Sequence, residues 1–174
     1  MAQKIAHRNL PQLLLKAREA LLGRFRAILH HFGLTEQQWR VIRSLAEHGP
    51  MEPNQLCQAC QILSPSMAGV LARMQAMDLI VRRRATHDQR RAIIRLAPRG
   101  QALCDRIAPL VEAQYRLIEE AIGRELIDRT YTQLDRLLSA PLDRIPQVEL
   151  PSPQLAAPRA RRGEGRALAP DMQE

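Results

Sequence analysis

The segment 35–96 limits the possible folds most narrowly, because short helical patterns in it are followed directly by two strand patterns. The first of these helices begins with a capping box, in which Thr35 is the expected N-cap and Gln38 follows three residues later. Gly49 and Pro50 end it. We expect its apolar stripe to contain Trp39, Ile42, Leu45 and Ala46.

A helix-turn-helix is expected in the next residues. A short helix is predicted over 53–60, and Ser64 with Pro65 supplies an N-cap and a first-turn proline for a second helix that ends near Met77. Its inward face would consist of Met67, Val70, Leu71 and Met74. The opposite face carries small side chains and one arginine, namely Ser64, Pro65, Ser66, Ala68, Gly69 and Arg73. Small side chains permit close approach to a phosphate backbone, so this face is predicted to contact DNA; the alternative is an ordinary surface helix.

A β-hairpin with a basic tip is predicted immediately afterwards. Strand patterns occupy 79–84 and 92–96, and the polar run 85–91 separates them. Basic side chains surround a single acid, Asp88, and they are Arg82, Arg83, Arg84, His87, Arg90 and Arg91. Asp88 could pair with Arg90 and hold the loop in shape while another arginine enters a minor groove. The alternative is a solvated run of charge, which contacts nothing.

Long amphipathic helices are predicted on both sides of this head, which spans about 35–97. They cover 9–31, 100–120 and 123–138, and Pro109 should bend the second of them. Their apolar surface exceeds what so small a head can bury, so an identical chain is the simplest partner. We therefore expect a homodimer joined by the helices at both termini.

A change in composition marks the end of the folded domain. Six of the twelve prolines lie in 141–174, where no apolar period remains, so the domain is expected to span 1–140 and the Pro/Arg-rich tail 141–174 to be disordered. The net charge is +8 and the pI is near 10.6. Because the charges of the tail cancel, the whole excess lies in 1–140 and makes polyanions the expected partners.

The pattern of apolar residues and the few cysteines indicate an intracellular protein without a cofactor. The sequence has no run of about 18 apolar residues and no signal-peptide pattern, so a cytoplasmic location and no membrane contact are expected. Cys57 and Cys60 have the spacing of a redox or zinc motif, but no second pair accompanies them. We favour a packing role over an enzyme that uses these thiols, and we expect no metal, no cofactor and no catalytic residue.

The ordered motifs resemble the MarR family of transcriptional regulators. The resemblance covers about residues 8–138 and rests on LTEQQWRVIRSL (34–45), LSPSMAGVLARMQAMDLIVRRR (63–84) and DQRRAIIRLAPRG (88–100). Ala97 and Pro98 depart from it, since many members have Leu-Thr there. The stretch from Arg8 to Trp39 is most similar to the HpaR- and NicR-like branch, which controls catabolism of aromatic and heteroaromatic acids. The implied fold is mainly α, a winged helix-turn-helix with a two-stranded β-hairpin wing and N- and C-terminal dimerisation helices.

The resemblance also implies a function. It predicts a dimeric repressor on a pseudo-palindromic double-stranded DNA operator, released when a small hydroxylated aromatic carboxylate, of hydroxynicotinate or hydroxyphenylacetate type, binds between the dimerisation helices and the head. A constitutive architectural DNA-binding protein without an effector is the alternative.

The residues themselves support an effector pocket. Arg18 lies on or beside the apolar stripe of the first helix, where a guanidinium group needs an anion. Trp39, Arg40 and Arg43 could add an aromatic wall and further cations. The alternative is that Arg18 pairs with a structural carboxylate such as Glu47 or one on the partner chain. The lesser candidates for this pocket are His7, Arg8, Asn9 and His30.

Overall fold

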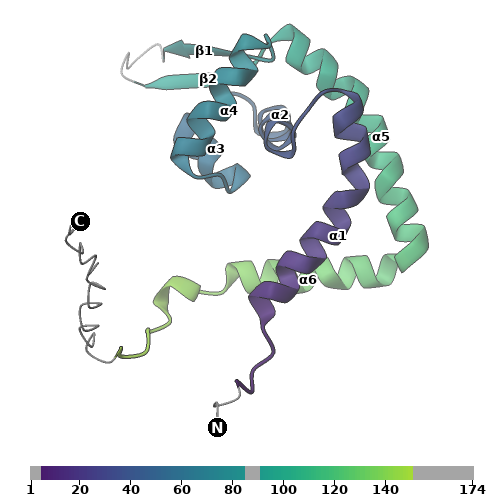
Figure 1. Ribbon diagram of the computed structural model, residues 1–174, viewed down its shortest axis with the longest axis vertical. Helices are drawn as coiled ribbons and strands as arrows, with labels where there is room; N and C mark the ends of the chain where they lie inside the picture. Colours follow the sequence, from purple (N-terminus) through teal and green to yellow (C-terminus); the bar gives the residue numbers. More distant parts are fainter. Residues whose placement is uncertain (1–4, 85–90, 151–174) are drawn as a thin grey trace, which may run out of the picture. The chain divides into compact units, whose positions relative to one another are not determined.

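The computed structural model describes residues 5–84 and 91–150. The helices are α1 (Leu10–His31), α2 (Glu36–His48), α3 (Pro53–Cys60), α4 (Ser64–Ala76), α5 (Pro98–Ile122) and α6 (Arg124–Ser139), followed by the single-turn 3₁₀ helix η1 (Leu142–Arg144). The strands β1 (Ile80–Arg84) and β2 (Ala92–Leu96) form an antiparallel pair. This order confirms a mainly α winged helix-turn-helix fold (Figure 1).

Capping residues fix the ends of the first two helices. The Asn9 side chain accepts a hydrogen bond of 3.0 Å from the Gln12 amide at the start of α1. The predicted capping box of α2 is present, because the Thr35 hydroxyl accepts from the Gln38 amide and the Gln38 side chain accepts from the Thr35 amide. Gly49 ends α2 with a φ of 75°, a conformation that favours glycine.

The core lies where α2 meets the helices and the hairpin around it. Val41 and Ile42 of α2 have no exposed surface. The predicted inward face of α4 is confirmed, since all four of its apolar side chains are buried. Ala46, expected on the stripe of α2, is exposed, whereas Gln38 and Ser44 are buried. The side-chain NH₂ of Gln38 donates a hydrogen bond of 3.5 Å to the Met77 sulfur, so this buried polar side chain has a partner for its donor group.

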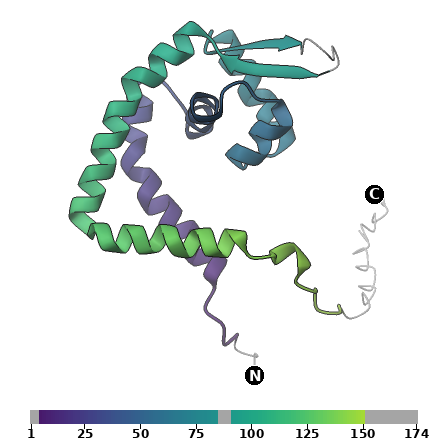
Figure 2. The same cartoon turned by 180° about the vertical axis from the view of Figure 1, so that it is seen from behind.

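The hairpin is tied to the rest of the head at both strands. Ile80 pairs with Leu96 and Arg84 with Ala92. An isolated bridge joins Met51 to Ile94, with backbone hydrogen bonds of 2.9 and 2.8 Å. The hairpin projects beside α4, near the start of α5, and Figure 2 shows the same arrangement from behind.

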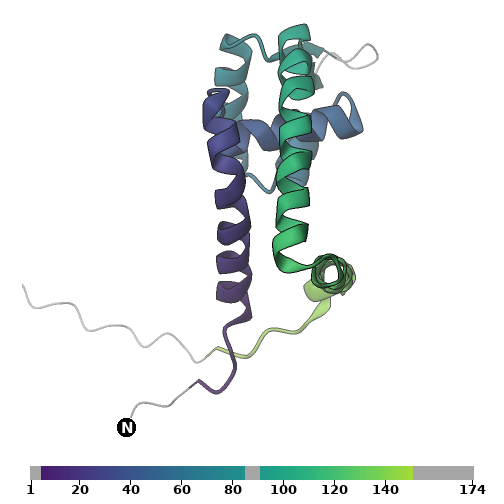
Figure 3. The same ribbon diagram turned by 90° about the vertical axis from the view of Figure 1, so that its right-hand side faces the viewer.

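The helices α1 and α5 run antiparallel, side by side (Figure 3). Contact is concentrated toward the end of α1, where Phe25 and Leu29 are buried and the rings of Phe25 and Tyr115 lie 4.8 Å apart. The first half of α1 is exposed in the single chain. The helix α5 continues through Pro109 and begins at Pro98, two residues earlier than the sequence pattern indicated.

Among the described residues no helix is long and apolar enough to cross a membrane. Residues 145–150 follow η1 as irregular, exposed chain, and 151–174 lie outside the described part. The division into a domain of 1–140 and a disordered tail of 141–174 therefore stays a prediction.

Candidate functional site

The outer face of α4 is open to solvent. Ser64, Pro65, Ser66 and Ala68 are exposed, Gly69 is half-buried, and Arg73 is exposed one turn further along. The inner face is fixed by the core, so the backbone of α4 is held rigidly behind this row. The helix thus presents small side chains outward, as the sequence predicted.

One detail at the start of α4 differs from the prediction. Leu63 is the N-cap and Ser64 is the first helical residue, so the expectation that Ser64 caps the helix is wrong by one position. The reason lies in α3: the Ser64 hydroxyl is 3.7 Å from the thiol of Cys57 rather than bonded to the free amides of its own helix.

Arginines continue the basic surface into the hairpin. Arg82, Arg83 and Arg84 of β1 are exposed. The predicted contacts His87, Asp88 and Arg90 lie outside the described residues, as does the predicted pair of Asp88 with Arg90. Arg91 lies at the base of the hairpin, and its guanidinium group contacts the carboxylate of Glu52, the residue before α3. This pair joins the hairpin to the helix-turn-helix.

The contact with Glu52 leads to a prediction about salt dependence. We expect Arg84→Ala to reduce the slope of log affinity for DNA against log salt by about one per protomer, because that charge is available to a phosphate. Arg91→Ala should leave the slope nearly unchanged, because Glu52 already compensates its charge. Fluorescence anisotropy with labelled DNA at several salt concentrations measures both slopes. Equal reductions in the two variants would show that Arg91 contacts phosphate.

A second group of functional side chains lies where α2 meets α5. Trp39 is half-buried against the core, and Arg43 follows one turn later. The Arg43 Nε donates to Glu47 at 2.6 Å. This hydrogen bond, together with a weaker one that Arg43 donates to the Tyr115 hydroxyl, raises the pKa of Arg43 against the opposing effect of burial. Tyr115 was not among the predicted site residues, although its position four residues after Val111, on the buried stripe of α5, could have indicated it.

In the single chain, Arg18 lies on the part of α1 that other elements leave uncovered. Its side chain is 49% exposed and lies 3.7 Å from the carboxylate of Glu36, which also accepts a 2.6 Å bond from Arg26. The structural carboxylate is therefore Glu36 and not Glu47, which pairs with Arg43. In the single chain, nothing in the described part covers the first half of α1, so the burial of Arg18 in a dimer stays a prediction.

Arg40 points to a different neighbour from Arg43. Its Nη1 donates to the carbonyl oxygen of Cys60 at 2.5 Å, so it caps the end of α3. Its Nε is buried without a hydrogen-bond partner in the described part of the chain. Asn9 is engaged in capping α1, and His7 is exposed. Within the described residues, the structure thus brings Arg43 next to Tyr115, with Trp39 one turn earlier on α2, whereas Arg18, Arg40 and Asn9 have other partners.

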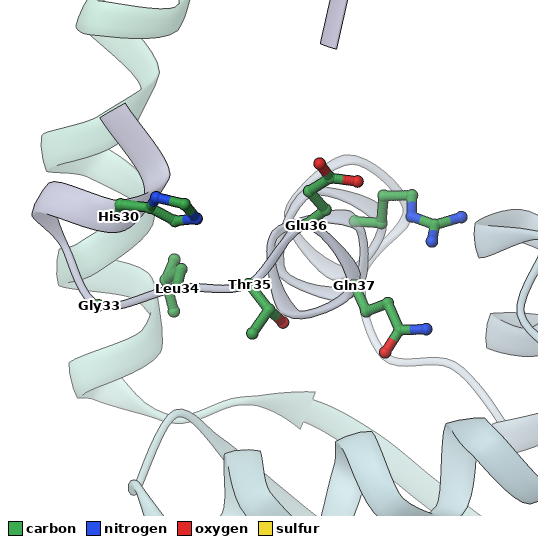
Figure 4. Close-up of a pocket in the computed structure, with 7 residues that line it drawn as sticks. His30, Gly33, Leu34, Thr35, Glu36 and Gln37 are labelled. Atoms are coloured by element: carbon green, nitrogen blue, oxygen red, sulfur yellow. The ribbon is translucent and has the colours of Figure 1, made fainter. Parts of the chain in front are cut away.

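A hollow of about 620 Å³ lies between the end of α1 and the first turn of α2 (Figure 4). His30 from α1 and Glu36 and Gln37 from α2 face this space, with the loop from Gly33 to Thr35 between the helices. No Trp, Tyr or Phe lines it, and it does not include Arg43. Arg40 also lines this hollow, but without an aromatic wall the hollow does not match the aromatic site that the sequence predicted.

The cysteines are arranged for packing. Burial raises the pKa of the Cys60 thiol, and a hydrogen bond with the Ser44 hydroxyl at 3.4 Å only partly offsets this. A thiol with a raised pKa is a poor nucleophile, because the thiolate is the reactive form. Burial raises the pKa of Cys104 in the same way. No group of three potential metal ligands occurs among residues 5–84 and 91–150.

Comparison with known proteins places this geometry in a family. The MarR family model matches residues 32–91. The HTH-type transcriptional regulator FarR of Neisseria gonorrhoeae is 40% identical over 125 residues, which are 72% of this chain and 86% of the relative. The homoprotocatechuate degradative operon repressor of Escherichia coli is 38% identical over 133 residues, covering 76% and 90%.

Comparison with a solved structure supports the same family assignment. The crystal structure of NadR in complex with 4-hydroxyphenylacetate has a TM-score of 0.70 and 37% identity, over 80% of this chain and 99% of that one. The relatives are regulators and not enzymes, and the resemblance seen in the sequence is confirmed. The chain belongs to the MarR family.

Proposed function

We propose that this protein is a repressor that binds a pseudo-palindromic DNA operator as a homodimer and releases it when a small hydroxylated aromatic or heteroaromatic carboxylate binds. The observation that carries the DNA-binding part is the exposed row of small side chains on α4, continued by the exposed arginines of β1. An α-helix fits the major groove, and small side chains let its backbone approach the phosphates. The arginines supply charge for phosphates beside that groove.

The homodimer is supported by apolar side chains that one chain leaves uncovered. They lie on α1, α5 and α6, and include Leu10, Leu13, Leu14, Leu15, Leu117, Leu126 and Leu138. So many exposed leucines would be costly in water, and a second copy is the simplest way to bury them. A two-fold dimer would present two α4 helices to two half-sites about 34 Å apart.

The effector part of the proposal rests on the Trp39, Arg43 and Tyr115 cluster. The Nε of Arg43 already donates to Glu47, so Arg43 offers its remaining guanidinium N–H groups to a ligand carboxylate. Trp39 and Tyr115 offer aromatic surface and a phenolic hydroxyl. The relative NadR was crystallised with 4-hydroxyphenylacetate, and the Escherichia coli relative is a homoprotocatechuate operon repressor. We therefore place hydroxyphenylacetates first among the candidate effectors, with hydroxynicotinates next.

The position of the cluster supports a mechanism. Arg43 lies on α2 of the head, whereas Tyr115 lies on α5, one of the proposed dimerisation helices. A ligand held by both would fix the angle between head and dimer interface. The protein releases DNA if the ligand binds more tightly to the arrangement in which the two α4 helices are wrongly spaced for the operator. A ligand with equal affinity for both arrangements would leave their populations unchanged.

A thermal-shift screen with hydroxylated phenylacetates, benzoates and nicotinates tests the effector. At a ligand concentration 100 times its Kd, native-state binding adds about 2.7 kcal/mol, or a rise in Tm of roughly 5 °C or more. We expect this rise with at least one acid, its loss in Arg43→Ala and its retention in the matched control Arg124→Ala. The same acid should weaken operator binding at least about tenfold.

The absence of any rise in Tm would contradict the effector proposal. The pairing of Arg18 with Glu36 is the observation that favours the alternative, a DNA-binding protein without an effector, because it gives Arg18 a structural role. A rise that survives Arg43→Ala but disappears in Arg18→Ala would instead move the effector to the first half of α1.

A further inference from the structure

A second hollow lies away from the Trp39, Arg43 and Tyr115 cluster, where the end of α1, the start of β1 and the first turns of α5 meet. Its volume is about 370 Å³. Ligand pockets commonly occupy 300–1,000 Å³, so the space suits a small molecule. The residues that line it are His31, Phe32, Met77, Leu79, Arg99, Ala102, Leu103 and Arg106.

The lining combines positive charge with an apolar wall. Arg99, Ala102, Leu103 and Arg106 are spaced 3, 4 and 7 residues along α5, which places them on one face of the helix. A cation thus stands at each end of this face, with apolar side chains between. Phe32, Met77 and Leu79 complete the apolar wall from the opposite side.

The arginines of this hollow are available to a ligand. Within the described part of the chain, neither Arg99 nor Arg106 has a side-chain hydrogen bond or an ion pair with an acid, and no carboxylate lines the space. The acid beside Arg106 in sequence, Asp105, accepts a 2.9 Å hydrogen bond from Gln101.

Arg106 is also held in place. Its guanidinium carbon lies 5.1 Å from the centre of the Phe32 ring, a cation–π contact that orders the side chain while its N–H groups stay free to donate. The His31 ring packs edge-on against Phe32 at 5.0 Å. A preorganised cation loses less conformational entropy on binding.

We propose that this hollow is a second small-molecule site, which binds an organic anion with an apolar body. The charge of the ligand is held by Arg99 and Arg106, and its apolar part lies against Phe32, Leu79 and Leu103. The site is independent of the proposed effector cluster, because the two share no residue. It also differs from the DNA-contacting face, since none of its residues lies on the outer face of α4 or in the exposed arginine row of β1.

The test uses 2-naphthoate as the probe and backbone amide NMR of the full chain. The Arg43→Ala variant is titrated in parallel with the unmodified protein. This separates binding at the hollow from binding at the Trp39, Arg43 and Tyr115 cluster. In both proteins, we expect the amide shifts of Phe32, Ala102, Leu103 and Arg106 to move together and to saturate with one Kd.

Two variants of the hollow should weaken this binding. The pair Arg99→Ala, Arg106→Ala removes the cations, and Ala102→Glu places a carboxylate at an exposed position between them; each should raise the Kd at least about tenfold. The matched control, Arg116→Ala with Arg124→Ala, removes two exposed arginines elsewhere and should leave the Kd unchanged. Unchanged binding in both hollow variants, or shifts confined to Trp39 and Tyr115, would overturn the proposal while leaving the effector cluster intact.

Discussion

Replacing Ala68 by glutamate is expected to lower operator affinity by about 100-fold or more, while the free energy of unfolding changes by less than about 0.5 kcal/mol. Ala68 is exposed on the outer face of α4, so the longer side chain enters solvent in the free protein. In the proposed complex the same side chain would stand between the helix and DNA. Its bulk would keep α4 out of the groove, and its charge would repel the phosphates.

Fluorescence anisotropy with a labelled operator and urea unfolding measure the two quantities. The matched control is Ala27→Glu, which makes the same change at an exposed helical alanine of α1. The control should bind DNA normally. Sedimentation at the same protein concentration checks that both variants have the oligomeric state of the unmodified chain. Operator affinity within threefold of the original in Ala68→Glu would remove the outer face of α4 from the DNA interface.

Local signals explain why most of the fold was predictable. The capping box at Thr35, the Gly49–Pro50 break and the proline after Ser64 each act within a few residues, so a single sequence contains them in full. The apolar face of α4 was predictable for the same reason, because a 3.6-residue period determines which side chains share a face. The N-cap of α4 was predicted one residue too late, because Ser64 contacts Cys57 of α3 instead of capping its own helix.

The site was less predictable because its partners are distant in sequence. Glu36 pairs with Arg18 and Arg26 of another helix, and Glu52 pairs with Arg91 across 39 positions. Tyr115 reaches Arg43 from α5. No local period encodes such contacts. Periodicity also placed Arg18 beside an apolar stripe, but it could not show that the first half of this stripe stays exposed in one chain.

The head and α5 meet closely just before β1. The Ala97 amide, just before α5, donates a backbone hydrogen bond of 3.0 Å to the Leu79 carbonyl oxygen. Gly100 lies one turn further along α5 and is buried. A Cβ atom at this position would lie 2.0 Å from the Leu79 carbonyl oxygen and 2.9 Å from its carbonyl carbon. The start of β1 and the start of α5 thus approach each other at a distance that only glycine permits.

Gly100→Ala is therefore expected to destabilise the fold by about 3 kcal/mol, since the atoms in the way belong to backbone and cannot rotate aside. Relief requires α5 to move away from Leu79, which strains the hydrogen bond from Ala97. The matched control is Gly23→Ala in α1, where a Cβ meets nothing within 4 Å. Alanine is the better helix former, so the control should stabilise the protein by about 0.5–1 kcal/mol.

Urea unfolding at one fixed protein concentration measures both variants, because a dimer has a concentration-dependent stability. The opposite signs of the two expected changes separate the close approach at Gly100 from the general effect of alanine in a helix. If Gly100→Ala were as stable as the unmodified chain, the contact between α5 and Leu79 could not be as close as the structure has it. If it is destabilised as expected, operator affinity measured well below its unfolding midpoint shows whether this contact also sets the position of the hairpin relative to α4.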